Sequence, residues 1–240
     1  MTALTADELR AGALLRLLAL ALAPPTEETR TAVVDLADAL SDDEEIDAHV
    51  LATAFASVTA ETLAADHHRL FGGTVALPPY ESSYELDPFR QARVLADVAG
   101  FYRAFGADVH GPAAERPDHA GTELEFLGLL AERRVAALDA GDAETADLVR
   151  EIEDGFLTDH AGRWLPTLFR RLALADPGGP YGALGLVGEQ VVAAELVARG
   201  LDPTAGHADP APLTAVEADD LTCAAGDEPV GPLVPPGGRG

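Results

Sequence analysis

The stretch that decides the fold is residues 152–168, IEDGFLTDHAGRWLPTL. Its large side chains recur every fourth residue, which is the spacing that places them along one face of an α-helix. The residues on this line are Ile152, Phe156, His160, Trp164 and Leu168. A histidine or tryptophan on such a stripe is more often a core residue with a polar partner than a ligand. Gly155, Gly162 and Pro166 favour a kink, so residues 142–174 are predicted as one long helix or two.

The same helical spacing continues in both directions, and prolines and glycines divide it into segments. We expect helices over residues 5–22, 26–40, 41–71 with a break near Ser57, 88–105, 117–140 and 180–199. Ser41 and Glu44 form a capping box for the third segment, and Pro117 suits the first position of the fifth. We find neither strand-like alternation nor an internal repeat. The sequence therefore predicts an all-α fold, a single-domain helical bundle over residues 1–200.

Residues 201–240 differ in composition from the rest of the chain. Proline, glycine, alanine and aspartate dominate this part, so it cannot bury enough apolar surface to offset the entropy cost of ordering. We expect a disordered, flexible tail, in which residues 213–221 could dock as a short helix. Cys223, the single cysteine, is expected to be an inert thiol there, because one cysteine forms neither an intramolecular disulfide nor a cysteine-based zinc site.

The charge balance is strongly acidic, with 41 aspartates and glutamates against 16 basic residues and a formal net charge of −25. Every basic residue is arginine, and lysine and asparagine do not occur. So large a charge repels itself at low ionic strength, whereas about 1 M salt screens it within about 3 Å. The composition therefore indicates a halophilic host. It also argues against nucleic acid and anionic lipid as partners, because both are bound by basic surfaces.

The apolar run at residues 11–23 is similar to the core of a signal peptide. However, Asp7 and Glu8 precede it where positive charge is expected, and Arg16 interrupts it. No run of about 18 consecutive apolar residues occurs. We therefore expect a protein of the cytoplasm that does not insert into a membrane.

Residues 78–88, PPYESSYELDP, are the first candidate site. Prolines reduce the entropy of a free loop, and tyrosines offer an apolar face with a polar tip, which suits the binding of a peptide. A lid that packs on the core for stability alone fits the same residues equally well.

The second candidate is Asp118-His119, followed by Glu123. His119 and Glu123 are four residues apart and share a helix face, which permits either a metal pair or a hydrogen-bonded pair. Two ligands are too few for a metal site, so the hydrogen-bonded pair is preferred. An aspartate beside a histidine on a concave surface could also bind amide or guanidinium groups of a peptide. No Gly-x-Ser-x-Gly motif and no phosphate-binding loop occurs, so nothing points to an enzyme.

Four segments in this order resemble the TorD/DmsD/NarJ family of chaperones for molybdenum-cofactor reductases. The similarity extends over roughly residues 5–199, and the loop motif together with Pro-Asp-His is its most specific part. The segments are His67-His68-Arg69-Leu70-Phe71, Pro79-Tyr80-Glu81-Ser82-Ser83-Tyr84, Arg116-Pro117-Asp118-His119 running into Glu123-Leu124-Glu125-Phe126-Leu127, and Phe156-Leu157-Thr158-Asp159-His160 with Trp164-Leu165-Pro166.

The resemblance implies a TorD-like helical domain with no catalysis and no cofactor of its own. Its expected partner is the catalytic subunit of a molybdopterin-dependent reductase, bound by its N-terminal twin-arginine signal segment until the cofactor is inserted. An acidic groove suits that peptide, because guanidinium–carboxylate pairs are strong. In high salt, apolar contacts should carry more of the affinity. The residues expected to contact the peptide are Tyr80, Glu81, Tyr84, Asp118, His119, Glu123 and Phe126.

Two other functions stay open at this point. The first is a helical interaction or regulatory protein without a reductase partner, against which the intact loop from Tyr80 to Tyr84 argues. The second is a metal-dependent enzyme that uses His119, Glu123 and His160. The sequence is compatible with a monomer or a homodimer, and glycine- and proline-rich hinges make a domain-swapped dimer conceivable.

Overall fold

The computed structural model describes residues 3–41, 46–72, 77–107 and 115–203. The chain divides into two units, Met1–Pro210 and Ala211–Gly240. All described helices belong to the first unit. Residues 204–240, which include Cys223 and most of the predicted tail, lie outside the described residues, as does Glu44 of the predicted capping box. The tail and the domain boundary therefore stay predictions.

The predicted all-α class is confirmed within the described residues, which contain helices, turns and one isolated bridge between Tyr80 and His119. The α-helices are α1 (Ala3–Leu22), α2 (Glu27–Ala39), α3 (His49–Ala56), α4 (Ala60–Phe71), α5 (Pro88–Ala104), α6 (Ala120–Asp139), α7 (Ala143–Phe156), α8 (Gly162–Ala175) and α9 (Pro180–Ala198). A 3-10 turn, η1 (Glu81–Tyr84), precedes α5, and a π-helical turn, η2 (Leu157–Ala161), joins α7 to α8.

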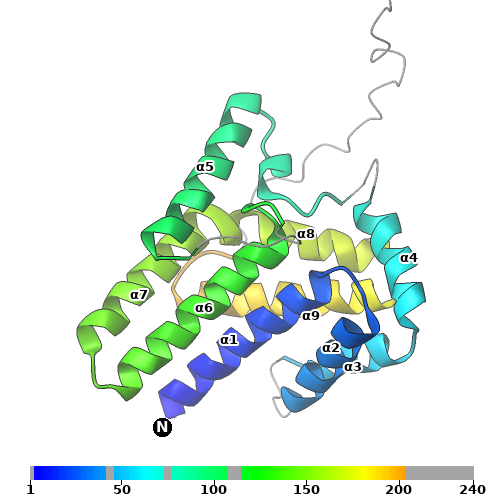
Figure 1. The fold of residues 1–240 in the computed structure, drawn as a ribbon, viewed down its shortest axis with the longest axis horizontal. Coiled ribbons are helices and arrows are strands. Elements are labelled where there is room, and N and C mark those ends of the chain that lie inside the picture. The colour runs from blue at the N-terminus through cyan, green and yellow to red at the C-terminus, as the bar shows by residue number, and fades with distance from the viewer. Residues whose placement is uncertain (1–2, 42–45, 73–76, 108–114, 204–240) are drawn as a thin grey trace, which may run out of the picture. The chain divides into compact units, whose positions relative to one another are not determined.

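Two helix pairs form the centre of this unit. Helix α1 packs along α6, and α8 packs along α9 (Figure 1). The second pair is close because α9 presents glycines to α8: a Cβ on Gly188 would lie 2.4 Å from the Phe169 ring. Such contacts bury both helices, and Phe169, Trp164 and Tyr181 are among the largest fully buried side chains.

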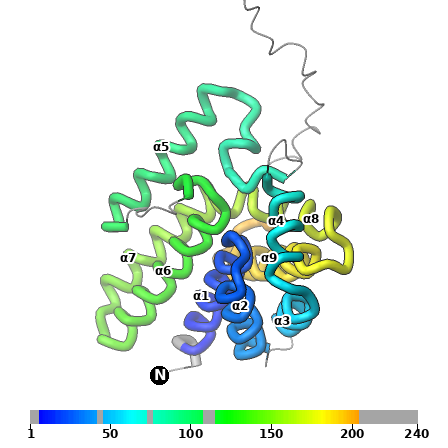
Figure 2. Tube along the Cα trace, turned by 45° about the vertical axis from the view of Figure 1, so that its right-hand side comes forward, coloured from blue at the N-terminus to red at the C-terminus, as the bar shows by residue number. Residues whose placement is uncertain are grey.

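Helix α5 is the least enclosed of the described helices and extends away from the α6–α7 pair (Figure 2). Its C-terminal half packs through Val98 and Tyr102, which are buried. The chain around its N-terminus does not pack in this way, since Phe89 on α5 and Leu86 just before it are 89% and 83% exposed. The turn η1, whose residues Glu81, Ser82 and Tyr84 are buried, precedes this exposed end of α5.

Two predicted helix starts differ from the structure. The third segment begins as α3 at His49, and the predicted break near Ser57 separates it from α4. The prediction for Pro117 was wrong, because α6 begins at Ala120 with His119 as its N-cap. Pro117 lies in a turn instead, since the Asp118 carbonyl accepts a hydrogen bond from the Glu81 N–H at 2.9 Å, and this pairing requires non-helical backbone before His119.

Within the described residues, α9 is long and apolar enough to cross a membrane by length and composition alone. However, 61% of this helix window is buried inside the fold, as is usual for the core helix of a globular protein. Its apolar surface is thus largely covered by α8 and the other helices around it.

Candidate functional site

The two candidate segments predicted from the sequence lie side by side. The Tyr80–His119 bridge joins them, and the Ala120 N–H donates to the Pro79 carbonyl at 2.9 Å. The Ser82 N–H donates to the Asp118 Oδ2 at 3.2 Å, which fixes the start of η1. This backbone pairing places the tyrosine loop against the N-terminus of α6.

His119 closes the N-terminus of α6. Its Nδ1 accepts a hydrogen bond from the Gly121 N–H at 3.1 Å, so this nitrogen carries no proton. Burial lowers the pKa of His119 below its ordinary value. The imidazole also meets the Tyr80 ring edge-on, with the ring centroids 5.4 Å apart. His119 thus serves as a neutral cap and as packing for Tyr80.

Residues 156–166, the last of the four segments that resemble the family, pack against this loop. His160, on η2, is 4% exposed, and its Nδ1 lies 3.1 Å from the Glu81 Oε2. The sequence indicated a satisfied core histidine here, and the structure gives it a carboxylate partner from a segment 79 residues away in the chain. Tyr84 packs on Trp164 with ring centroids 5.1 Å apart. The loop is therefore anchored to η2 and α8 by one histidine–carboxyl hydrogen bond and one aromatic contact.

Glu123 lies fully buried beneath the loop. It accepts a hydrogen bond from the Trp164 Nε1–H at 2.9 Å. Burial raises the pKa of Glu123 well above its usual range, and the nearby Glu81 carboxylate adds to this shift. Glu123 therefore holds its proton more tightly than a solvent-exposed glutamate does, because burial penalises the charged form.

Arg116 covers the outer side of Asp118. Its Nη2 donates to the Asp118 Oδ2 at 2.9 Å and to the Ser82 Oγ at 2.8 Å. The guanidinium carbon lies 4.6 Å from the centroid of the Tyr80 ring, a cation–π arrangement. The Asp118 side chain is 0% exposed, whereas the Arg116 side chain is 47% exposed. A buried carboxylate is thus paired with a cation that reaches solvent.

The residues expected to contact a peptide differ in accessibility. Tyr80 is half-buried and lies beside the exposed Glu115 and Arg116. The others are buried: Glu81, Tyr84, Asp118, His119, Glu123 and Phe126. Phe126 packs in the core, with ring centroids 4.7 Å from Tyr102. The structure thus gathers the predicted residues other than Phe126 within or against one loop, and of the seven only Tyr80 is partly exposed.

Sequence reasoning assigned no role to Arg116 or to the contact between Glu81 and His160. Neither carries a local signal, since Arg116 lies outside any periodic segment and the other pair is distant in the chain. In contrast, the hydrogen-bonded pair of His119 and Glu123 that the sequence favoured was wrong, because the His119 Nδ1 accepts from the Gly121 N–H and the Glu123 Oε2 accepts from the Trp164 Nε1–H. Among the described residues, no group of three or more histidine, cysteine or acidic side chains could hold a metal ion.

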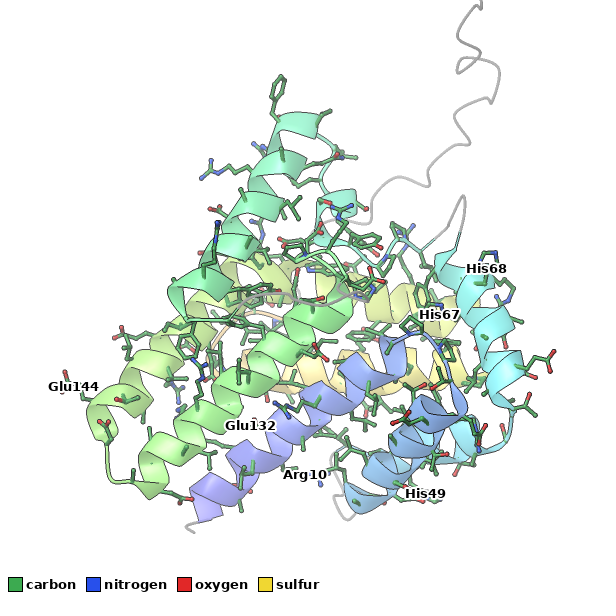
Figure 3. The ribbon with its side chains drawn as sticks, in the orientation of Figure 1. Arg10, His49, His67, His68, Glu132 and Glu144 are labelled. Carbon is green, nitrogen blue, oxygen red and sulfur yellow. The ribbon has the colours of Figure 1, made fainter. Side chains whose placement is uncertain are left out.

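His67 and His68, which belong to the first segment that resembles the family, lie on different sides of α4 (Figure 3). The His67 Nε2 lies 3.3 Å from the Leu22 carbonyl oxygen, and its ring packs edge-on against Phe71. His68 is exposed. The two rings therefore form no joint site.

Comparisons with known proteins identify the family of the chain. The family model described as nitrate reductase delta subunit matches residues 23–170, more than half of the chain. The selenate reductase assembly chaperone protein of Thauera selenatis is 36% identical over 134 residues, which cover 54% of this chain and 68% of that protein. The chlorate reductase assembly chaperone protein of Ideonella dechloratans is 35% identical over 119 residues, 48% of this chain and 60% of that protein.

A further relative is the chaperone protein TorD of Aeromonas salmonicida (strain A449), 32% identical over 124 residues, which cover 52% of this chain and 54% of that protein. Among solved structures, one described as a redox enzyme maturation protein from Archaeoglobus fulgidus matches with 25% identity and a TM-score of 0.41, covering 62% of this chain and 94% of that one.

Proposed function

The chain belongs to the nitrate reductase delta subunit family, the TorD/NarJ group of redox-enzyme maturation chaperones, and on this premise we propose that it binds the N-terminal segment of a reductase catalytic subunit. In this proposal it holds that segment, a twin-arginine signal peptide, until the molybdopterin cofactor is inserted, and it does so in the cytoplasm. The relatives are named as assembly chaperones, and the chain is itself not an enzyme.

The observation that carries this proposal is the convergence of the family-like segments on one loop. Tyr80, in the second of the four segments that resemble the family, bridges to His119 in the third, and Glu81 pairs with His160 in the fourth. A loop anchored at three places keeps its aromatic face in one position, so that a peptide does not have to order it on binding. Tyr80 supplies an aromatic ring and the exposed Glu115 supplies a carboxylate beside it, which suits a peptide with arginines followed by apolar residues.

The exposures divide the predicted residues into two roles. Tyr80, at the surface, contacts the peptide directly, together with the neighbouring Glu115. Glu81, Asp118 and His119 hold Tyr80 and the η1 turn in place from below. Tyr84, Glu123 and Phe126 are buried, so direct contacts from them would require η1 to leave the helices on which it packs.

The experiment is a pull-down of the tagged protein from its host's lysate at high salt, with mass spectrometry of the bound proteins. The informative variant is Tyr80→Ala, because Tyr80 is half-buried and its loss spares the buried carboxylates. Phe89→Ala removes another exposed aromatic ring and is the matched control. We expect a molybdopterin-dependent catalytic subunit with the wild type and with Phe89→Ala, and its loss with Tyr80→Ala. Absence of any such subunit from the folded wild-type sample refutes the proposal.

A further inference from the structure

From the contacts of Arg116 we infer that its guanidinium occupies, in the free protein, the position that an arginine of the client peptide takes on binding. The guanidinium site consists of the Tyr80 ring, the Ser82 Oγ and the Asp118 carboxylate. This inference rests on the proposed function and specifies how its site selects a ligand. Arg116 is then an internal competitor that the peptide displaces.

The chemistry of the site matches a guanidinium group in three respects. An aromatic face lies 4.6 Å from the guanidinium carbon, and a carboxylate and a hydroxyl accept hydrogen bonds at 2.9 and 2.8 Å. Planar guanidinium stacks on an aromatic ring and binds carboxylate through parallel N–H groups, whereas a lysine ammonium has no such plane. The site therefore prefers arginine to lysine.

Arg116 does not use this site fully. Both of its hydrogen bonds come from a single nitrogen, Nη2. The Asp118 Oδ1 is buried and has no hydrogen-bond partner in the part of the chain that the structure describes. An unsatisfied buried carboxylate oxygen is unfavourable. An incoming arginine that reaches both oxygens in bidentate fashion would satisfy it and thereby displace Arg116.

The exchange must replace one cation by another. The Asp118 side chain is 0% exposed, and a buried carboxylate without a cation is strongly destabilising. Arg116 is half-exposed, so its side chain can turn into solvent while the His119 N–H keeps its bond to the Arg116 carbonyl at 3.1 Å. Because Arg116 must be displaced, a lysine ammonium, which lacks the planar geometry of the site, competes poorly, and only a guanidinium competes well.

The test measures binding of a fluorescein-labelled synthetic peptide with two adjacent arginines and an apolar run, and of the same peptide with two lysines. Fluorescence anisotropy at high salt gives Kd for the wild type, Arg116→Ala and Arg116→Lys. Removing an internal competitor that fills most of the site should lower Kd for the arginine peptide about tenfold in Arg116→Ala. The Kd of Arg116→Lys for the arginine peptide should lie between those of the wild type and Arg116→Ala, because lysine occupies the site more weakly than arginine. If Arg116→Ala does not fold, the comparison of Arg116→Lys with the wild type tests the inference.

Arg93→Ala is the matched control, since it removes the same charge from an 82% exposed side chain on α5 and should leave Kd unchanged. Equal or weaker binding by the Arg116 variants refutes the internal competitor while the proposed function stands. If even the wild type binds no peptide, the proposed function fails, and a second measurement decides the inference. Millimolar methylguanidinium should then raise the thermal midpoint of Arg116→Ala, but not of the wild type or of Arg116→Ala/Asp118→Asn. No rise in Arg116→Ala refutes the inference.

Discussion

Replacement of Glu153 by glutamine should raise the free energy of unfolding at pH 8. At pH 5 the same substitution should raise it much less. Glu153 lies on α7 and is 1% exposed. Its Oε2 lies 3.4 Å from Arg199 and 3.9 Å from Arg134, so both ion pairs are long. Burial raises the pKa of Glu153 from 4.5 to about 7, although both arginines oppose the shift.

The raised pKa means that the folded state binds the proton more tightly than the unfolded state. The protonated carboxyl therefore makes its full contribution to the free energy of unfolding below pH 4.5, and this contribution is lost as the pH rises to about 7. A shift of about 2.5 pKa units corresponds to a ceiling of about 3 kcal/mol. A cavity of about 260 Å³ beside Glu153 admits water, which reduces the cost of the ionised form, so we expect about 1–3 kcal/mol.

Glutamine keeps the shape of the side chain and removes the titration. The arginines keep other partners, because Arg134 also pairs with Glu8 at 2.8 Å and Arg199 also pairs with Asp154 at 3.3 Å. Neither cation is left buried without an acid. The substitution should therefore reveal the cost of ionising Glu153 with little other disturbance.

The assay is urea unfolding of wild type and Glu153→Gln from pH 5 to pH 8.5 at constant high salt. The difference in free energy of unfolding should grow in favour of glutamine as the pH rises, and level off above about pH 7.5. Parallel pH profiles for the two proteins would refute the reasoning. A variant that is less stable at pH 8 would show that the ion pairs outweigh the burial cost.

Three further substitutions should lower stability for separate reasons. Trp164→Phe removes the hydrogen-bond donor to the buried Glu123 and leaves a cavity, so urea unfolding should show a loss of about 2–4 kcal/mol. Gly188→Ala places a Cβ 2.4 Å from the Phe169 ring, and overpacking of this kind costs about 1–3 kcal/mol, seen as a lower thermal midpoint. Gly141→Ala meets no atom within 4 Å but has φ +74°, so strain alone should cost about 1 kcal/mol, and a loss above about 2 kcal/mol would contradict this.

The candidate site was predictable in its parts but not in its assembly. The sequence singled out the loop at Tyr80, the Asp118-His119 pair and the stripe through His160 and Trp164, because each has a local signature. It gave no means to pair Glu81 with His160 or to bury Glu123 against Trp164, since these contacts join segments far apart in the chain. It also placed Pro117 in α6, because the pairing of the Asp118 carbonyl with the Glu81 N–H has no local signal.

By itself, the sequence determined that the described chain is helical and where most helices break, because helical period, proline and glycine act within a few residues of one another. Gly141 and Gly200, for example, follow α6 and α9 with positive φ, as helix-ending glycines do. Only the tertiary structure decided which polar side chains are buried, which of them have shifted pKa values and which cation covers Asp118. Those properties depend on desolvation and on partners brought in from distant segments, and neither is encoded in local spacing.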